Sequence, residues 1–309
     1  MDATDQEMLA AKLAQARERL AAQPAPQSSS GGWQPDTPKP VETGDFAWWR
    51  TEATDKTCEG CRRPFVAQVF IHKRNGKTLL DPKLCEPCKA EAEEAEAEAA
   101  IRAQVEQRSR PDDPPFIKRL EAGGISPNLY GATLKNFDAS ENPEARESVR
   151  SFVKAIINPE ANADARKWLY LWGAVGLGKS HLLVGAARAL HVTGYSGRVV
   201  VDSSPHLVRR VQSGYGKGDS DQIVDARVSA DVWMLDDLGR GKQKDDAVAI
   251  ISEILHSREG RWTFITSNYM RQGLPSRHED YETLASRLGP RSCVIVEAKG
   301  RDRREDQPE

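Results

Sequence analysis

The sequence predicts an α/β protein whose main domain is a parallel sheet flanked by helices, with a small metal-binding module nearer the N-terminus. Three observations support this prediction. From residue 113 onward, short apolar runs alternate with helical patterns, which is typical of a parallel sheet. A glycine-rich segment at 173–180 falls between one such run and a helical pattern. Four of the five cysteines form two Cys-x-x-Cys pairs before residue 90.

The composition limits the class of protein and its compartment. At 309 residues the chain is longer than one typical domain, so one main unit with smaller appendages is expected. With 44 basic and 46 acidic side chains, the net charge indicates no partner, and a nucleic-acid surface would have to be a local patch. No apolar run approaches the roughly 20 residues that span a bilayer. The N-terminus also lacks a signal-peptide core, so we expect a cytoplasmic protein.

The sequence divides into five parts. Residues 1–22 place leucines at helical spacing among charges, which predicts a short amphipathic helix. Residues 23–45 are dense in Pro, Ser and Gly and predict a flexible linker, and residues 46–90 contain the paired cysteines. Residues 91–112 are rich in helix formers but nearly lack an apolar stripe, which predicts a solvated connector helix acting as a spacer. The remaining residues, 113–309, form the predicted α/β domain.

The paired cysteines predict a zinc-binding module. The two pairs are separated by a strand-turn-strand stretch, with an apolar run at 65–71 and a turn at 75–76. Such a hairpin can bring four thiolates into the tetrahedral geometry of a Zn²⁺ site, and four thiolates leave no open position for catalysis. The zinc would therefore be structural, and the alternatives are a redox pair or free thiols. The predicted ligands are Cys58, Cys61, Cys85 and Cys88.

Five apolar runs predict the strands of the main sheet. They fall at 168–172, 198–202, 232–235, 262–266 and 293–297. Three of them end directly in polar residues. Since the carboxyl ends of parallel strands meet at one edge, where α/β folds place ligands, we expect these polar residues to form one site.

The glycine-rich segment predicts an ATP site. It follows the strand WLYLW and precedes the helical run HLLVGAARAL, which is the context that a P-loop requires. Its backbone amides and the helix N-terminus would bind the phosphates, Lys179 would reach the β and γ oxygens, and Ser180 would ligate Mg²⁺. The alternative is a chance glycine-rich turn. The predicted nucleotide-binding residues are Gly173, Ala174, Val175, Gly176, Leu177, Gly178, Lys179, Ser180 and His181.

Acidic and amide side chains follow the next two strands of the predicted site. The strand at 232–235 ends in Asp236 and Asp237, the arrangement of a Walker B element. We expect Asp236 to hold Mg²⁺ and Asp237 to polarise the attacking water as a general base, unless Asp237 only caps the following turn. Asn268, after the strand at 262–266, could orient that water.

One segment is a candidate for contacts to single-stranded DNA. Between the second strand and the Walker B strand, basic residues lie beside an aromatic one, which suits backbone contacts together with base stacking. The alternative is a solvated helix face and loop. The candidate residues are Arg209, Arg210, Tyr215 and Lys217. A second basic cluster, Arg240, Lys242 and Lys244, follows the Walker B strand, where it could respond to DNA and nucleotide together.

Taken in order, the motifs GAVGLGKSHLL, MLDDLG, FITSNY, LASRLG and GRDRR resemble the AAA+ ATPases of the DnaC/DnaI helicase-loader and IstB group. The resemblance covers roughly 113–309 and implies an AAA+ P-loop NTPase core. It implies that Asn268 is sensor 1, that Arg287 is an arginine finger acting on a neighbouring subunit's nucleotide, and that Arg304 is similar to sensor 2. It also implies that Tyr130 and Phe137 line the adenine pocket. The alternative for Arg287 is a surface arginine on a helix.

The resemblance implies a function in DNA replication. We expect an ATP-dependent, self-assembling loader that delivers a DnaB-type replicative helicase onto single-stranded DNA, with ATP, Mg²⁺ and Zn²⁺ as cofactors. The zinc module is similar to those of DnaI-like and phage-type loaders, and the chain ends soon after Arg304, which agrees with a truncated lid. The alternatives are an IstB-like transposition ATPase that binds duplex DNA and a transposase, and a non-replicative ATP-binding adaptor.

Overall fold

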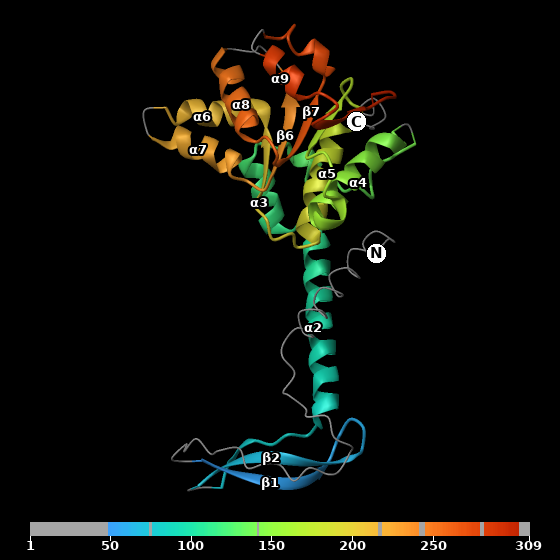
Figure 1. Cartoon of the computed structure of the whole chain (residues 1–309), viewed down its shortest axis with the longest axis vertical. Helices are drawn as coiled ribbons and strands as arrows, with labels where there is room; N and C mark the ends of the chain where they lie inside the picture. Colours follow the sequence, from blue (N-terminus) through green and yellow to red (C-terminus); the bar gives the residue numbers. More distant parts are fainter. Residues whose placement is uncertain are drawn as a thin grey trace. The chain divides into compact units, whose positions relative to one another are not determined.

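The structure is a computed structural model, which describes residues 49–73, 76–140, 142–215, 218–240, 245–278 and 281–302 (Figure 1). The chain divides after Gln104 into two compact units, and each is described by itself. The predicted N-terminal helix at 1–22 and the predicted linker at 23–45 lie outside the described residues. Within the described ranges, no helix combines the length and the apolar character needed to cross a membrane.

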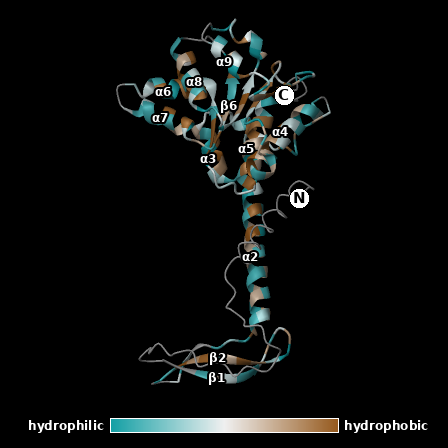
Figure 2. Cartoon of the chain, in the orientation of Figure 1, coloured by the Kyte–Doolittle hydropathy of each residue, from teal (hydrophilic) through white to brown (hydrophobic). Residues whose placement is uncertain are grey.

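The first unit contains an antiparallel sheet with the order β1-β2-β3. The strands are β1 (Trp49–Thr57), β2 (Pro64–His72) and β3 (Thr78–Leu80). The predicted apolar run at 65–71 lies within β2, and Ala67 and Val69 on one face of that strand are buried. Figure 2 shows β2 in hydrophobic colours. Gly76, in the turn after β2, has a φ of 68° and donates its N–H to the carbonyl of His72.

Helix α2 (Glu86–Ser109) leads out of the second cysteine pair. It begins earlier than the predicted connector at 91–112. Pro87 does not prevent this start, because the backbone N–H groups in the first turn of a helix have no intrahelical partner. Glu86 in the same turn interacts favourably with the helix dipole. Val105 is its buried residue, so the helix depends on strong intrinsic propensity rather than on an apolar face.

The second unit is built on a five-stranded parallel sheet with the order β5-β6-β7-β4-β8. Its strands are β4 (Trp168–Trp172), β5 (Val199–Ser203), β6 (Val232–Leu238), β7 (Trp262–Ser267) and β8 (Cys293–Glu297). The helices are α3 (Pro114–Ala122), α4 (Pro143–Ile157), α5 (Lys179–Val192), α6 (Ser204–Ser213), α7 (Asp219–Val228), α8 (Asp245–Ser257) and α9 (Tyr281–Arg287). Three short 3₁₀ turns are η1 (Pro127–Leu129), η2 (Glu160–Asn162) and η3 (Arg271–Gly273).

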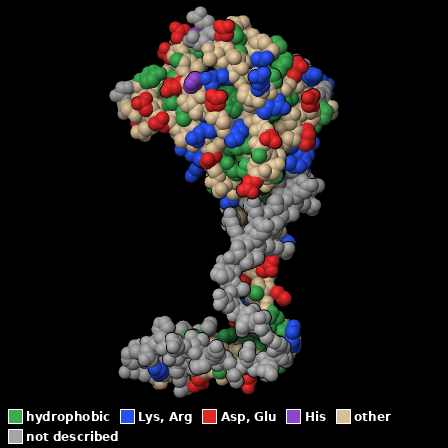
Figure 3. All heavy atoms as spheres, viewed as in Figure 1, with side chains coloured by type: hydrophobic (Ala, Val, Ile, Leu, Met, Phe, Trp, Pro, Cys, Tyr) green, Lys and Arg blue, Asp and Glu red, His purple; other side chains and the backbone are tan. Residues whose placement is uncertain are grey.

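Helices cover both faces of this sheet. Along β4, Leu169 and Leu171 point into one apolar cluster with helices α3, α4 and α5, while Trp168 and Tyr170 point into a second cluster with α6, α8 and α9. This alternation follows from the two-residue period of a strand. The three-layer arrangement confirms the predicted α/β class, a parallel sheet flanked by helices. On the face shown in Figure 3, acidic and basic side chains are interspersed, in agreement with the near-zero net charge.

Helix α7 was not predicted, and a buried ion pair explains part of its stability. Arg227 on α7 donates two hydrogen bonds to the carboxylate of Asp202 at the end of β5, at 3.0 and 2.7 Å. Trp233 of β6 donates its indole N–H to the same carboxylate. Because both charges are buried and satisfied by each other, the pair fixes α7 against the sheet without leaving an isolated charge.

Arg258 joins the starting ends of β6 and β7. Its side chain is fully buried and donates hydrogen bonds to the carbonyls of Arg227, Ala230 and Trp262. A further bond goes to the hydroxyl of Thr263. Burial lowers the pKa of this guanidinium to about 10, which still leaves it charged at neutral pH. These contacts satisfy carbonyls in the last turn of α7, in the segment before β6 and at the first residue of β7.

Candidate functional site

The glycine-rich loop joins β4 to α5, as the sequence predicts. Gly176 and Gly178 have φ values of 81° and 80°, a left-handed conformation that is unfavourable for other residues. A Cβ atom on Gly178 would also lie 2.7 Å from the ring of Phe137. Glycine is therefore required at this position by both backbone and packing. The conformation turns the loop around the N-terminus of α5, where backbone N–H groups can bind phosphate.

Lys179 is the first residue of α5 and is buried, with 5% of its surface exposed. Its ammonium group donates to the carbonyls of Gly173 and Ala174 at 2.8 and 2.6 Å. These carbonyls hold the charge at the centre of the loop. A bound phosphate offers the ammonium a stronger, charged acceptor at the same place.

A cavity of about 540 Å³ opens beside the loop. Its volume falls in the range of ligand pockets, roughly 300–1,000 Å³. It brings together Lys179, Ser180, Asp236, Asp237 and Asn268, which the sequence predicts as parts of one site. The other lining residues are Gly124, Ser126, Asn128, Leu129, Phe137, Val175, Gly176, Gly178, His181, Ser203 and Arg240. Of the remaining predicted loop residues, Gly173 and Ala174 contribute carbonyls to Lys179, and Leu177 is buried in the core.

Asp236 lies at the buried end of the cavity. Its pKa is raised to about 6, by burial first and then by the nearby charge of Asp237, while hydrogen bonds from the hydroxyls of Thr266 and Ser180 and the charge of Lys179 oppose the rise. The Thr266 hydroxyl donates to its Oδ1 at 2.6 Å. A buried carboxylate beside a serine hydroxyl supplies the oxygen donors that Mg²⁺ favours. The residues present therefore fit a magnesium ion, which would offset the unfavourable burial of the charge.

Asp237 has a strained backbone. Its φ is 61°, which is uncommon for a residue other than glycine, and the pairing register between β6 and β7 shifts between Leu235 and Leu238. Its N–H donates to the Thr266 hydroxyl at 3.0 Å. Its carboxylate lines the cavity and pairs with Arg240, with 2.6 Å between Oδ2 and Nη1. The bulge thus turns the side chain out of the sheet and toward the cavity.

Thr266 is a site residue that the sequence analysis missed. Its hydroxyl accepts from the Asp237 N–H and donates to the Asp236 carboxylate, so one group fixes both acids. Thr266 lies near the end of β7, next to β6 in the sheet. The sequence signal that could have identified Thr266 is its position as a polar residue near the end of a predicted apolar strand. The strand order that makes β6 and β7 neighbours could not be obtained from local sequence.

Of the two aromatic residues expected around the adenine, one lines the cavity and the other does not. Phe137 lines the cavity and contacts His181 edge to face, with ring centroids 5.5 Å apart. The His181 Nε2 lies 2.9 Å from the carbonyl of Thr133 and from Oδ1 of Asn136. Tyr130 is not among the residues that line the cavity, and its carbonyl accepts a hydrogen bond from Arg188.

The predicted arginine finger lies outside its own cavity. Arg287 ends α9, and its Nη1 donates to Glu259 at 3.3 Å. It does not line the cavity, so any action on a phosphate would require a neighbouring subunit. Arg304 lies outside the described residues.

The candidate DNA contacts lie on and after α6. Arg209 is exposed on this helix, and Arg210 donates to the carbonyl of Ala122 at 2.9 Å. Tyr215 is 52% exposed, which is high for an aromatic residue. Lys217, and also Lys242 and Lys244 of the second basic cluster, lie outside the described residues.

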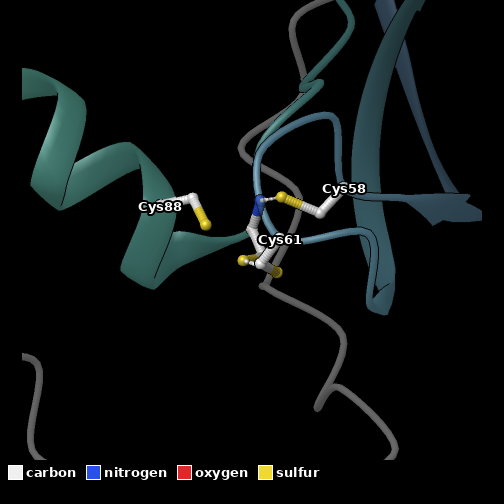
Figure 4. A group of neighbouring side chains, drawn as sticks. Cys58, Cys61 and Cys88 are labelled. Carbon is white, nitrogen blue, oxygen red and sulfur yellow. Dashed lines mark hydrogen bonds between the residues drawn. The ribbon is translucent and has the colours of Figure 1, made fainter.

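The four paired cysteines form a candidate metal site in the first unit. Their sulfur atoms all lie within 4.8 Å of one another, and those of Cys61 and Cys85 are 3.7 Å apart. Zn–S bonds of about 2.3 Å in a tetrahedron place sulfurs about 3.8 Å apart, so the group has the size of a zinc site. Cys58 and Cys61 come from the turn after β1, and Cys88 from the first turn of α2 (Figure 4).

The ionisation of these thiols also fits a cation. The backbone N–H of Cys85 donates to the sulfur of Cys58 at 3.3 Å, and this bond contributes most to lowering the pKa of Cys58 to about 6. Contacts with the other thiols, that of Cys85 first, raise the pKa of Cys88 to about 12. One thiolate therefore forms easily, whereas the fourth is opposed by accumulated negative charge. A divalent cation removes that opposition.

Comparisons with known proteins agree with these features. No family model matches the chain. The replicative helicase loader DnaI of Bacillus subtilis (strain 168) is 25% identical over 182 residues, which cover 56% of this chain and 57% of DnaI. The chain thus spans less than two thirds of that relative's length. This match confirms the resemblance to DnaC/DnaI-like loaders that the motifs predict.

Among solved structures, the DnaC helicase loader has a TM-score of 0.49 and 24% identity, covering 56% of this chain and all of that one. A DnaI structure has a TM-score of 0.46 and 22% identity, covering 58% of this chain and 94% of that one. The DnaA protein of Aquifex aeolicus, bound to AMPPCP, has a TM-score of 0.47 and 22% identity, covering 58% of this chain and 53% of that one.

Proposed function

We propose that this protein is an ATPase that loads a replicative helicase onto single-stranded DNA. The observation that carries the ATPase part is the convergence of Lys179, Ser180, Asp236, Asp237 and Asn268 on one cavity of about 540 Å³. These residues come from three separate strand ends, as expected for a ligand site of an α/β sheet. The observation that supports the loader part is the similarity to DnaI.

Each of the five residues that converge on the cavity has a role in this proposal. The loop amides and Lys179 bind the triphosphate, and the ammonium moves from the loop carbonyls onto phosphate oxygens. Asp236 and Ser180 would hold Mg²⁺, which when bound offsets charge on the β and γ phosphates. Asp237 accepts a proton from the attacking water, and Asn268 orients that water. Thr266 fixes the carboxylate of Asp236 and the backbone of Asp237 through its hydroxyl and is a positioning residue.

The proposal requires assembly of several subunits. Arg287 is absent from the lining of its own cavity, and a cationic group that reaches the γ-phosphate is expected to accelerate hydrolysis strongly. Supplied from a neighbouring subunit, Arg287 would make turnover depend on the assembled state. Arg304 would act on the nucleotide from the C-terminal segment of the same chain.

The first unit is proposed to bind the helicase. Its cysteine cluster would hold a structural Zn²⁺ that stabilises a three-stranded sheet with little core of its own. Because the ATP site already accounts for the cavity of the second unit, a separate module is available for partner recognition. The exposed residues on and after α6, Arg209 and Tyr215, would contact single-stranded DNA through phosphates and stacking.

The proposal is tested with Lys179→Ala. We expect this variant to lose ATP turnover while keeping its fold, because the Lys179 ammonium binds the loop carbonyls of Gly173 and Ala174 and its side chain belongs to neither apolar core cluster. Lys154→Ala, an exposed lysine on α4 that is not part of the cavity lining, is the matched control. Normal ATP turnover in the Lys179 variant would contradict the assignment of the site.

The partner is identified separately, by pull-down from the host with Lys179→Ala as bait. Recovery of a DnaB-type helicase ring would support the loader function. Recovery of a transposase, together with binding to duplex DNA, would instead support an IstB-like protein. Recovery of neither, with measurable ATP turnover in the wild type, would reject the loader function but keep the ATPase.

A further inference from the structure

The ion pair between Asp237 and Arg240 has no role in the function proposed above. The Nη1 atom of Arg240 lies 2.6 Å from Oδ2 of Asp237, and both residues line the nucleotide cavity. The two side chains differ in exposure, 17% for Asp237 and 63% for Arg240. The guanidinium therefore lies at the rim of the cavity, and the carboxylate lies further inside.

The backbone around Asp237 favours this pairing. Asp237 has a φ of 61° and Gly239 a φ of 81°, and the N–H of Arg240 donates to the Asp237 carbonyl at 3.2 Å. This tight turn brings the side chain of Arg240 back beside that of Asp237. The Thr266 hydroxyl fixes the Asp237 backbone but not its carboxylate, since it bonds to the Asp237 N–H. The carboxylate itself accepts a hydrogen bond from Arg240, so loss of the guanidinium would let it turn further into the cavity.

A carboxylate bonded to a guanidinium at the rim is poorly placed to act as a base. A base has to come within hydrogen-bond distance of the water that attacks the γ-phosphate. One oxygen of Asp237 is occupied by Arg240, whose guanidinium lies on the solvent side of the carboxylate. Ion pairs with an exposed partner are weak, so another anion at the rim can displace this one.

We propose that Arg240 is a positioning residue that restrains Asp237 until a phosphate group at the cavity rim takes over the guanidinium. The proposal rests on the ATPase function proposed above and adds its regulation. Two sources can supply the phosphate: the γ-phosphate of the nucleotide or the backbone of single-stranded DNA. A guanidinium binds either with the same forked geometry. In both cases the arrival of phosphate frees Asp237 for its role in hydrolysis.

The test measures ATP turnover of wild type, Arg240→Ala and Arg240→Lys in the full chain, with and without an oligodeoxythymidylate. If DNA supplies the phosphate, we expect Arg240→Ala to raise the DNA-independent kcat about two- to fivefold, the range expected for loss of a weak exposed ion pair. If the γ-phosphate supplies it, bound ATP already frees Asp237 in wild type, and kcat should stay unchanged. Arg240→Lys keeps a cation and should stay close to wild type. In the double variant with Asp237→Asn, the gain should vanish, because Arg240 acts through Asp237.

The source of the phosphate is identified by two further measurements. If DNA supplies it, the oligonucleotide stimulates wild type and no longer stimulates Arg240→Ala, while the KM for ATP is unchanged. If the γ-phosphate supplies it, Arg240→Ala weakens binding of ATP more than binding of ADP, with or without DNA. Arg150→Ala, which breaks another i,i+3 arginine pair outside the cavity lining, is the matched control.

Several results would overturn the inference. A lower kcat in Arg240→Ala would show that Arg240 assists hydrolysis instead of restraining it. An unchanged kcat together with unchanged responses to DNA and nucleotide would show that the ion pair has no effect. If wild type hydrolyses ATP in either case, the proposed ATPase function stands. Wild type and Arg240→Ala both without turnover would reject the ATPase function as well.

Discussion

Replacing Asp236 by Asn should stabilise the nucleotide-free protein at neutral pH while abolishing its response to Mg²⁺. Burial raises the pKa of Asp236 to about 6 from an ordinary value of 3.8. Below about pH 4 the carboxyl is protonated in both the folded and the unfolded chain. As the pH rises toward 6, the unfolded chain releases this proton first, so the free energy of unfolding decreases across that window.

The size of the effect follows from the pKa difference. About two pKa units correspond to roughly 3 kcal/mol, which is the upper bound of the penalty that remains above pH 6. Asparagine has no proton to lose and keeps an oxygen that can accept from the Thr266 hydroxyl. Asp236→Asn should therefore be more stable than wild type by up to about 3 kcal/mol at pH 7.5, and the difference should shrink toward zero near pH 4.

Urea denaturation followed by circular dichroism between pH 4 and pH 8 measures this difference. Asp164→Asn, at an exposed position, is the matched control. Asp237→Asn removes the second cause of the raised pKa and should give part of the same stabilisation. Adding Mg²⁺ with a non-hydrolysable ATP analogue should stabilise wild type much more than Asp236→Asn. The reasoning is wrong if Asp236→Asn is no more stable at pH 7.5, or if its advantage is the same at pH 4.5.

The remaining predictions concern the cysteine cluster and the arginine finger. We expect one Zn²⁺ per chain by elemental analysis, lost in Cys58→Ser but kept in Cys293→Ala, since Cys293 lies in β8. Loss of zinc should raise hydrogen exchange across β1–β3, and full protection after chelation would contradict a structural metal. We expect Arg287→Ala to bind ATP normally but to hydrolyse it poorly, and mixing it with Lys179→Ala should restore part of the turnover. No recovery in mixed assemblies confirmed by cross-linking would remove Arg287 from the catalytic machinery.

Much of the fold could be predicted because the determining patterns are local. The strands at 168–172 and 293–297 were predicted with the bounds that the structure gives, since each is a continuous apolar run bounded by polar residues. The Walker B strand was predicted to end at 235, whereas β6 continues to Leu238 through a bulge. Two acids do not look like strand residues. Asp236 stays in the sheet through its pairing with Ser203 of β5, and pairing with β7 resumes at Leu238. The sequence did not predict helix α7, because the Asp202 carboxylate that binds Arg227 of this helix lies on β5, which is distant in sequence.

The sequence by itself determined the chemistry of the candidate site. The glycine-rich loop with Lys179, the acids after an apolar strand and the paired cysteines each predict their ligand from residue type and spacing. These signals survive without tertiary information because each group lies within a few residues of the element that positions it.

Only the tertiary structure decided how these groups interact. The strand order makes β6 and β7 neighbours, so that the hydroxyl of Thr266 bonds to two consecutive acids of another strand. The packing around the end of β6 buries Asp236 far enough to raise its pKa. Each of these effects depends on contacts between distant parts of the chain or on burial. Strand pairing and exclusion of water are properties of the folded chain as a whole, and no local sequence pattern specifies them.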